Sequence, residues 1–197
     1  NFNSLKKFFK PPQNKLIDKF DYKKFKVNKT KPIAIVEDKI FHFQYPETKE
    51  FLTEIGIPLI SWSIFNDEEI PNEARSVIIP GGFPEKYAEH VSNSEKSLMS
   101  LKKFRKSGFI YAECGGMMIL GSSIKDEKGI CHKMSGILPF NSKKGKLSVG
   151  YRDIKGVRDL PIIKRNQFIR GHEFHYWEIE SLLSNYDEKN SLEKGNL

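Results

Sequence analysis

Short apolar runs separated by longer polar segments give this chain the pattern of alternating strands and helices. Four runs of four or five residues predict buried strands, at 32–36, 58–62, 77–80 and 109–112. Apolar residues at helical spacing predict helices over 45–56 and 93–107, each with a glycine at or just after its end. This alternation predicts a three-layer α/β domain, with a mostly parallel sheet covered on both faces.

The pattern changes after Gly121. Residues 123–139 predict a hairpin whose turn lies near 126–129, and further strands are predicted at 147–154 and 167–179. The tail from Ser181 is rich in Asn, Ser, Glu and Lys. We therefore expect one domain over 31–180, followed by a C-terminal tail over 181–197.

Charge is concentrated at the start of the chain. The 197 residues carry a net charge of +8, but residues 1–30 alone hold nine Lys and two Asp. We expect a basic linker over 1–30 and no nucleic-acid partner, because no nucleic-acid-binding motif accompanies the charge. Two cysteines make no disulfide framework, and no apolar run approaches the roughly 20 residues that span a bilayer. These observations favour a cytoplasmic protein with no membrane contact.

The most informative segment for chemistry is the one around Cys114. An apolar strand ends at Ala112, Gly115 and Gly116 follow the cysteine, and a second apolar run begins there. A strand, a tight turn and a helix with a nucleophile at the apex make a nucleophile elbow. The helix amino terminus is expected to favour the thiolate of Cys114.

A nucleophilic cysteine needs a base, and the chain offers five histidines: His42, His90, His132, His172 and His175. His132 follows Cys131, but neighbours on a strand point to opposite faces. In the segment 170–176, His172 and His175 would face opposite sides of a strand, while Glu173 and His175 share one face. Only one of these two histidines can therefore point into a site. The segment is one residue short of the H-E-x-x-H zinc motif, so we expect no metal.

Two further segments could bind substrate. The loop Pro80-Gly81-Gly82 follows a strand, and it is either a tight turn or a source of N–H donors. An oxyanion hole needs two donors, and Gly82 N–H and Gly115 N–H are the candidates. Arg152 could clamp the α-carboxylate of an amino-acid substrate, or it could be an ordinary surface arginine. The chain has no phosphate-binding P-loop.

Taken in order, these motifs resemble the class I glutamine amidotransferase domain of cobyrinic acid a,c-diamide synthases. The matching segments are 34–36, 80–85, 111–117, 135–139, 150–152 and 171–176, so the resemblance covers about residues 31–180. It implies a flavodoxin-like fold and a soluble glutaminase. It also implies that Cys114 attacks glutamine to give a thioester and that His175 acts as acid and base. Many class I enzymes place a Glu two residues after this histidine, where this chain has Trp177, so a Cys–His dyad is expected; Glu173 could orient His175.

The resemblance further implies a missing upstream synthetase domain. That domain would use ATP and Mg²⁺ to activate carboxylates of cobyrinic acid for amidation, while the present chain would itself hold no cofactor. Three alternatives stay open at this point. They are a glutaminase for another acceptor (cobyric acid synthase or peptidoglycan-precursor type), a non-catalytic module that binds glutamine or docks to a synthetase, and a cysteine peptidase.

Overall fold

The computed structural model describes residues 22–28, 30–160 and 162–183. Its first sheet is parallel and has the strand order β2-β1-β3-β4. The strands are β1 (Ile33–Val36), β2 (Leu59–Trp62), β3 (Ser76–Ile79) and β4 (Phe109–Ala112). All four were predicted from their apolar runs. β1 is buried at every position because it lies in the middle of a sheet that has helices on both faces.

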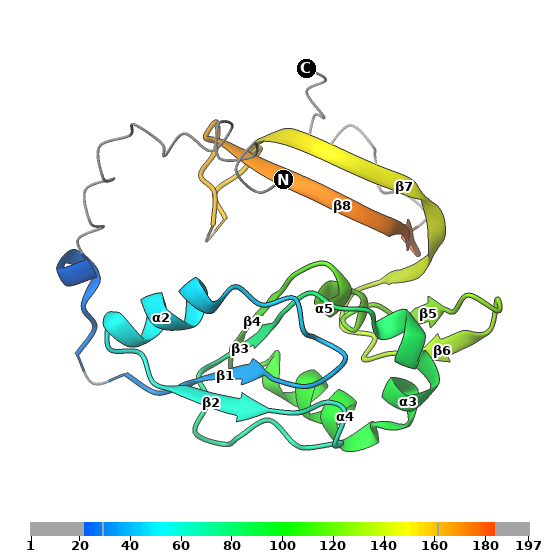
Figure 1. The fold of residues 1–197 in the computed structure, drawn as a ribbon, viewed down its shortest axis with the longest axis horizontal. Coiled ribbons are helices and arrows are strands. Elements are labelled where there is room, and N and C mark those ends of the chain that lie inside the picture. Colours follow the sequence, from blue (N-terminus) through cyan, green and yellow to red (C-terminus); the bar gives the residue numbers. More distant parts are fainter. Residues whose placement is uncertain (1–21, 29, 161, 184–197) are drawn as a thin grey trace, which may run out of the picture.

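Helices α2 (Pro46–Glu54) and α4 (Glu95–Phe104) lie on opposite sides of this sheet (Figure 1). The strand order requires this, because right-handed crossovers that move in opposite directions from the centre place their helices on opposite faces. The predicted three-layer arrangement is confirmed.

Shorter helices lie in the segments before, between and after the strands of the parallel sheet. They are the 3-10 helices η1 (Tyr22–Phe25) and η2 (Pro84–Tyr87), and the α-helices α3 (Ala88–Asn93) and α5 (Gly115–Met118). The sequence did not predict α3, which ends next to the start of α4. The helical conformation ends at Ser94, whose backbone lies outside the helical region. The Ser94 hydroxyl donates to the carbonyl of His90 at 3.1 Å.

A second sheet follows the nucleophile segment. It has the order β6-β5-β7-β8 and contains β5 (Ser123–Lys125), β6 (Cys131–Lys133), β7 (Phe140–Lys155) and β8 (Phe168–Ser181). β5 and β6 form the predicted hairpin. The predicted strand over 147–154 is too short, since β7 begins at Phe140 and pairs with both β5 and β8.

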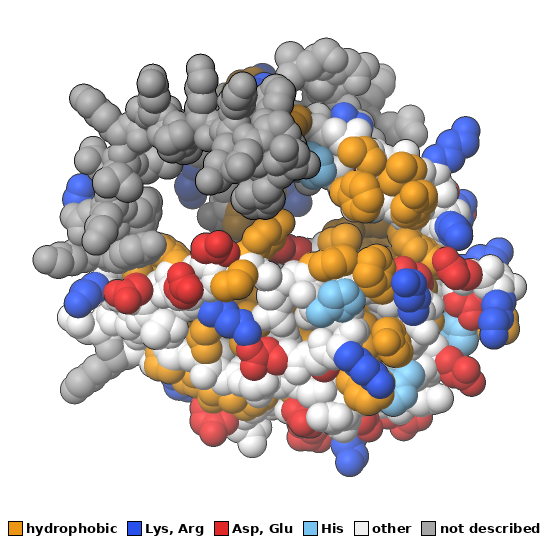
Figure 2. All heavy atoms as spheres, viewed as in Figure 1, with side chains coloured by type: hydrophobic (Ala, Val, Ile, Leu, Met, Phe, Trp, Pro, Cys, Tyr) orange, Lys and Arg blue, Asp and Glu red, His pale blue; other side chains and the backbone are white. Residues whose placement is uncertain are grey.

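The long antiparallel hairpin β7–β8 lies on the side of the parallel sheet where α2 and α5 are found (Figure 1). Its two faces differ. Glu173, His175 and Trp177 of β8 are half-buried, while the residues between them are exposed. The outer face carries exposed apolar side chains, including Val149, Tyr151, Phe174 and Tyr176. Figure 2 shows hydrophobic side chains gathered over this part of the surface.

Several expectations fall partly or wholly outside the described residues. Most of the basic linker predicted over 1–30 and most of the tail predicted over 181–197 lie there. Across the described ranges, no helix is both long and apolar enough to cross a membrane.

Candidate active site

Cys114 occupies a strained turn between β4 and α5. Its φ of 48° and ψ of −116° lie in a region that residues with a side chain rarely adopt. Hydrogen bonds on both sides hold the turn: Glu113 N–H donates to the carbonyl of Ile79 at 3.0 Å, and Gly116 N–H donates to the carbonyl of Glu113 at 2.8 Å. This geometry is that of a nucleophile elbow.

The two glycines after Cys114 are required by close packing. A Cβ atom at Gly115 would lie 2.4 Å from the carbonyl oxygen of Gly82, and one at Gly116 would lie 2.4 Å from that of Ile79. Both distances are shorter than any real contact of a Cβ atom. The elbow therefore lies directly against the loop after β3, which is the loop that the sequence offered as an oxyanion site.

That loop is held from the other side by the segment after β1. Asp38 accepts hydrogen bonds from Ile40 N–H at 2.9 Å and Phe41 N–H at 3.2 Å, which fixes the segment. The carbonyl of Ile40 then accepts from Phe83 N–H at 3.1 Å. A Cβ atom at Gly82 would lie 1.9 Å from the Ile40 oxygen, so only glycine fits.

The two predicted oxyanion donors, Gly82 and Gly115, come from these packed segments. Within the described residues, Gly82 N–H has no acceptor in the protein. Gly115 N–H hydrogen-bonds toward the Cys114 thiol, which lowers the pKa of that thiol. The two amides are thus free of other backbone acceptors, as an oxyanion hole needs. Their role stays a prediction.

The pKa of Cys114 is raised from its ordinary value, contrary to the expectation that the helix would favour thiolate. Cys114 is exposed as a residue, yet the atoms around its sulfur desolvate it, and this is the largest effect. The Gly115 N–H opposes the rise, and the carboxylates of Glu85 and Glu113 add to it. The expected stabilisation of the thiolate by the Gly115 N–H is therefore present, but desolvation and the two carboxylates outweigh it.

His175 projects from the half-buried face of β8, as predicted from the alternation of the strand. Its Nδ1 lies 2.7 Å from the carbonyl oxygen of Trp177. A carbonyl only accepts, so Nδ1 carries the proton and Nε2 is the basic nitrogen of the neutral ring. Within the described residues, no hydrogen bond joins His175 to Cys114. The assignment of His175 as the base stays a prediction.

Glu173 and Arg152 share this face of the hairpin with His175. Glu173 Oε2 lies 4.0 Å from His175 Nε2, and Glu173 Oε1 accepts from Arg152 Nη2 at 2.6 Å. A hydrogen bond from Ser148 is the largest effect and lowers the pKa of Glu173; burial opposes it, and the charge and hydrogen bond of Arg152 lower the pKa further by smaller amounts. Arg152 is therefore already paired with a carboxylate, and its predicted contact with a substrate carboxylate would use the remaining edge of its guanidinium.

The sequence did not single out Glu85 and the main chain of Trp177, although both belong to this region. Glu85 is only 7% exposed, and its Oε2 has no hydrogen-bond partner. Burial raises the pKa of Glu85; its own main-chain N–H and the Lys86 charge oppose the rise most, and the approach of the Trp177 side chain opposes it least. This approach of the indole lacks regular hydrogen-bond geometry, but it brings β8 next to η2. The only signal in the sequence was the Glu that ends the Pro80–Glu85 motif.

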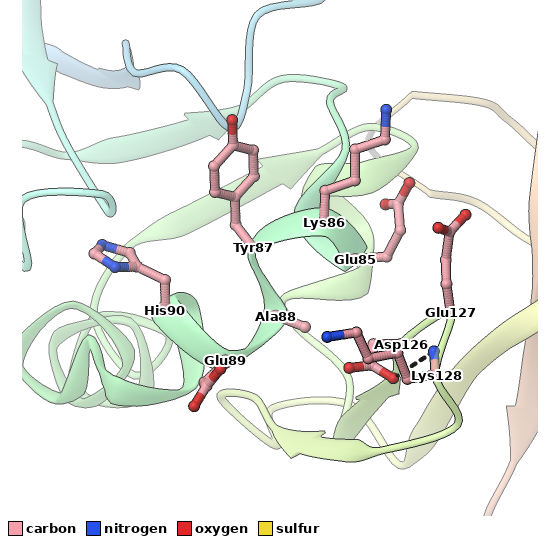
Figure 3. Close-up of a pocket in the computed structure, with 9 residues that line it drawn as sticks. All are labelled: Glu85, Lys86, Tyr87, Ala88, Glu89, His90, Asp126, Glu127 and Lys128. Carbon is pink, nitrogen blue, oxygen red and sulfur yellow. Dashed lines mark hydrogen bonds between the residues drawn. The ribbon is translucent and has the colours of Figure 1, made fainter.

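A pocket of about 390 Å³ lies beside this region, between η2, α3 and the turn of the β5–β6 hairpin. Its lining includes Glu85, His90 and Glu127 but not Cys114. In Figure 3 the side chains of Glu85 and Glu127 point the same way, away from the Asp126 carboxylate. Glu85 is therefore at the border between this pocket and the elbow.

The other histidines are engaged elsewhere. His132 Nε2 lies 2.9 Å from Asp126 Oδ2 in the β5–β6 hairpin. His90 stacks on Phe65, with ring centroids 4.2 Å apart. His172 lies on the outer face of the β7–β8 hairpin, 5.2 Å from the Tyr151 ring. His42 is in the loop after β1, 5.5 Å from the Phe83 ring.

Comparison with known proteins decides the family. The model of the CobB/CobQ-like glutamine amidotransferase domain matches residues 32–191. The chain belongs to this family. A solved structure titled PurLQS from Thermotoga maritima has a TM-score of 0.51 at 14% sequence identity, covering 79% of this chain and 72% of that one. At that identity the likeness supports the fold alone, and it agrees with the predicted class I amidotransferase-like fold.

Curated relatives carry related names. The chain is 37% identical over 179 residues to cobyrinate a,c-diamide synthase of Caldanaerobacter subterraneus subsp. tengcongensis, covering 89% of this chain and 39% of the relative. It is 34% identical to the Salmonella typhimurium protein of that name, covering 73% and 32%. It is also 34% identical to hydrogenobyrinate a,c-diamide synthase of Mesorhizobium japonicum, covering 73% and 33%. The chain thus spans about a third to two-fifths of these relatives.

Proposed function

We propose that this chain is the glutaminase part of a cobyrinate a,c-diamide synthase, which hydrolyses glutamine to supply ammonia for amidation. The observation that carries the proposal is the strained elbow at Cys114, packed against a glycine loop with an unused N–H, in a chain that belongs to the amidotransferase family. The relatives' names support the choice of acceptor.

The proposed first half of the reaction consumes the amide. The Cys114 thiol gives its proton to His175 Nε2, and the sulfur attacks the side-chain amide carbon of glutamine. Gly82 N–H and Gly115 N–H stabilise the negative oxygen of the tetrahedral intermediate. The C–N bond then breaks, and the proton held by His175 passes to the leaving nitrogen, so that ammonia departs and a thioester remains.

The second half regenerates the enzyme. His175 Nε2 takes a proton from water, which attacks the thioester carbon. The C–S bond breaks, glutamate leaves, and the proton returns to the sulfur. The Trp177 carbonyl contributes by accepting from Nδ1–H, which keeps Nε2 free to receive and return the proton. This orienting contact would supply the function of the acidic third residue that is absent at position 177.

ATP and Mg²⁺ belong, in this proposal, to a synthetase part outside the sequence given, because the chain contains no P-loop. The relatives are far longer than the chain, which is consistent with a second functional part. The exposed apolar face of the β7–β8 hairpin, with Tyr151 and Phe174 about two-thirds exposed, is the kind of surface that a partner domain covers.

A comparison of nitrogen sources tests this function in the full-length protein. Cys114→Ala should abolish amidation of cobyrinic acid with glutamine as the nitrogen source and leave amidation with ammonium chloride intact. Assaying hydrogenobyrinic acid in parallel would identify the preferred acceptor. If the variant loses both activities while remaining folded, Cys114 has a structural role and the proposed function is wrong.

A further inference from the structure

Glu85 is a buried acid with no cation in direct contact with its carboxylate. Its side chain is among the most enclosed charged groups described, and Oε2 has no hydrogen-bond partner. Within the described residues, no Lys, Arg or His nitrogen lies within 4.0 Å of its carboxylate. The charge of the neighbouring Lys86 lowers the pKa of Glu85 from a distance, but its ammonium group extends over the Phe83 ring, 4.5 Å from the ring centroid. A buried carboxylate is costly unless it is paired or protonated, and a cation brought against Glu85 would remove that cost.

This carboxylate lies among the elements that carry the proposed chemistry. Pro84, the residue before it, is so close to the elbow that a Cβ atom on Gly115 would lie 2.7 Å from Pro84 Cδ. The carboxylate is also near enough to Cys114 to influence its thiol. From the hairpin, the Trp177 side chain approaches it, two residues from His175. Glu85 thus adjoins the nucleophile, the oxyanion loop and the strand of the base.

We propose that Glu85 receives the α-ammonium group of glutamine and so determines the specificity of the site for an α-amino acid amide. The proposal rests on the proposed glutaminase function. Glutamine carries one cationic group, and Glu85 is a buried acid beside the nucleophile that no cation contacts directly. Arg152, on the facing hairpin, is a candidate for the α-carboxylate, so the two ends of the amino-acid group would meet opposite charges.

The same contact would couple binding to activation of the nucleophile. The Glu85 carboxylate raises the pKa of the Cys114 thiol in the free protein. An ammonium group on Glu85 cancels that charge and favours transfer of the thiol proton to His175 Nε2. Cys114 would therefore become a better nucleophile when the substrate is in place.

Glutaramate, which is glutamine without its α-amino group, tests the proposal in the full-length protein. We expect the wild type to release ammonia from glutamine with a kcat/KM about 10- to 100-fold above that for glutaramate, the range expected for a charged hydrogen bond. Glu85→Gln should lower the value for glutamine by a similar factor and leave glutaramate within about threefold, so the preference should collapse. Glu127→Gln is the matched control, since this exposed acid also raises the pKa of Glu85, and it should keep the wild-type preference.

The other outcomes separate failure of the Glu85 assignment from failure of the proposed function. Equal efficiency of the wild type on both substrates would overturn the assignment of Glu85 while leaving the glutaminase function standing, and this result requires no variant. An equal loss on both substrates in Glu85→Gln would also overturn it, because a merely structural role predicts that result. Release of ammonia from neither substrate by the wild type would overturn the proposed function itself.

Discussion

Replacing Gly115 by alanine tests how the elbow and the glycine loop depend on each other. The new Cβ atom would lie 2.4 Å from the Gly82 oxygen and 2.7 Å from Pro84 Cδ. Ordinary contacts of a Cβ atom begin at 3.4 Å, so the loop and the elbow must separate by about 1 Å. One contact is with backbone and the other with a proline ring, and neither can rotate away as a flexible side chain could.

The displacement should damage catalysis more than stability. Overpacking of a well-packed region costs about 1–3 kcal/mol, which a domain of this size can tolerate. A misplacement of about 1 Å between reacting groups costs about 100-fold in rate, and loss of one oxyanion donor costs about 100- to 1,000-fold in kcat. We therefore expect kcat for ammonia release from glutamine to fall at least about 100-fold in a variant that still folds.

The assay compares kcat at saturating glutamine with the free energy of unfolding in urea. Gly171→Ala is the matched control, because a Cβ atom there meets nothing within 4 Å. It should change kcat less than about twofold and the stability by less than about 0.5 kcal/mol. If Gly115→Ala retained a third or more of the wild-type kcat, the close packing of elbow and loop would not be needed for catalysis, and this reasoning would be refuted.

Two further predictions concern the thiol and the core. In a Cys131→Ser background, iodoacetamide should alkylate Cys114 with a pH midpoint above the ordinary cysteine pKa, because burial and two carboxylates disfavour the thiolate. Glu85→Gln should lower that midpoint, and a wild-type midpoint below the ordinary value would contradict the electrostatics described. Leu101→Ala, which removes a fully buried side chain of α4, should cost about 2–5 kcal/mol of stability in urea unfolding. A loss below about 1 kcal/mol would show that α4 does not pack as described.

The parallel sheet and the elbow could be predicted from local sequence patterns. Each of the four strands was a short apolar run, and the glycines around Cys114 marked a turn whose need for glycine the packing distances explain. The first part of β7 was missed because residues 141–146 are polar and contain a glycine. Pairing with β8, including the ion pair of Lys143 with Glu180 at 3.1 Å, keeps this polar segment extended.

The features that the sequence could not give depend on contacts between distant segments. Glu85 becomes notable only because the β8 strand folds back beside η2, about 90 residues later in the chain. The tautomer of His175 depends on a main-chain carbonyl, for which no residue type is diagnostic. The raised pKa of Cys114 could not be predicted from the sequence, because it depends on the desolvation of the thiol and on the carboxylate of Glu85, which packing brings near.

The central claim is that Cys114 forms a covalent intermediate with glutamine, and covalent trapping tests it most directly. The full-length protein would be incubated with 6-diazo-5-oxonorleucine, a glutamine analogue that alkylates a nucleophile in the glutamine site, and then digested and analysed by mass spectrometry. We predict one adduct, on the peptide that contains Cys114, and protection by excess glutamine. An unlabelled Cys114 in a protein that still binds glutamine would contradict the claim and identify the domain as a binding module.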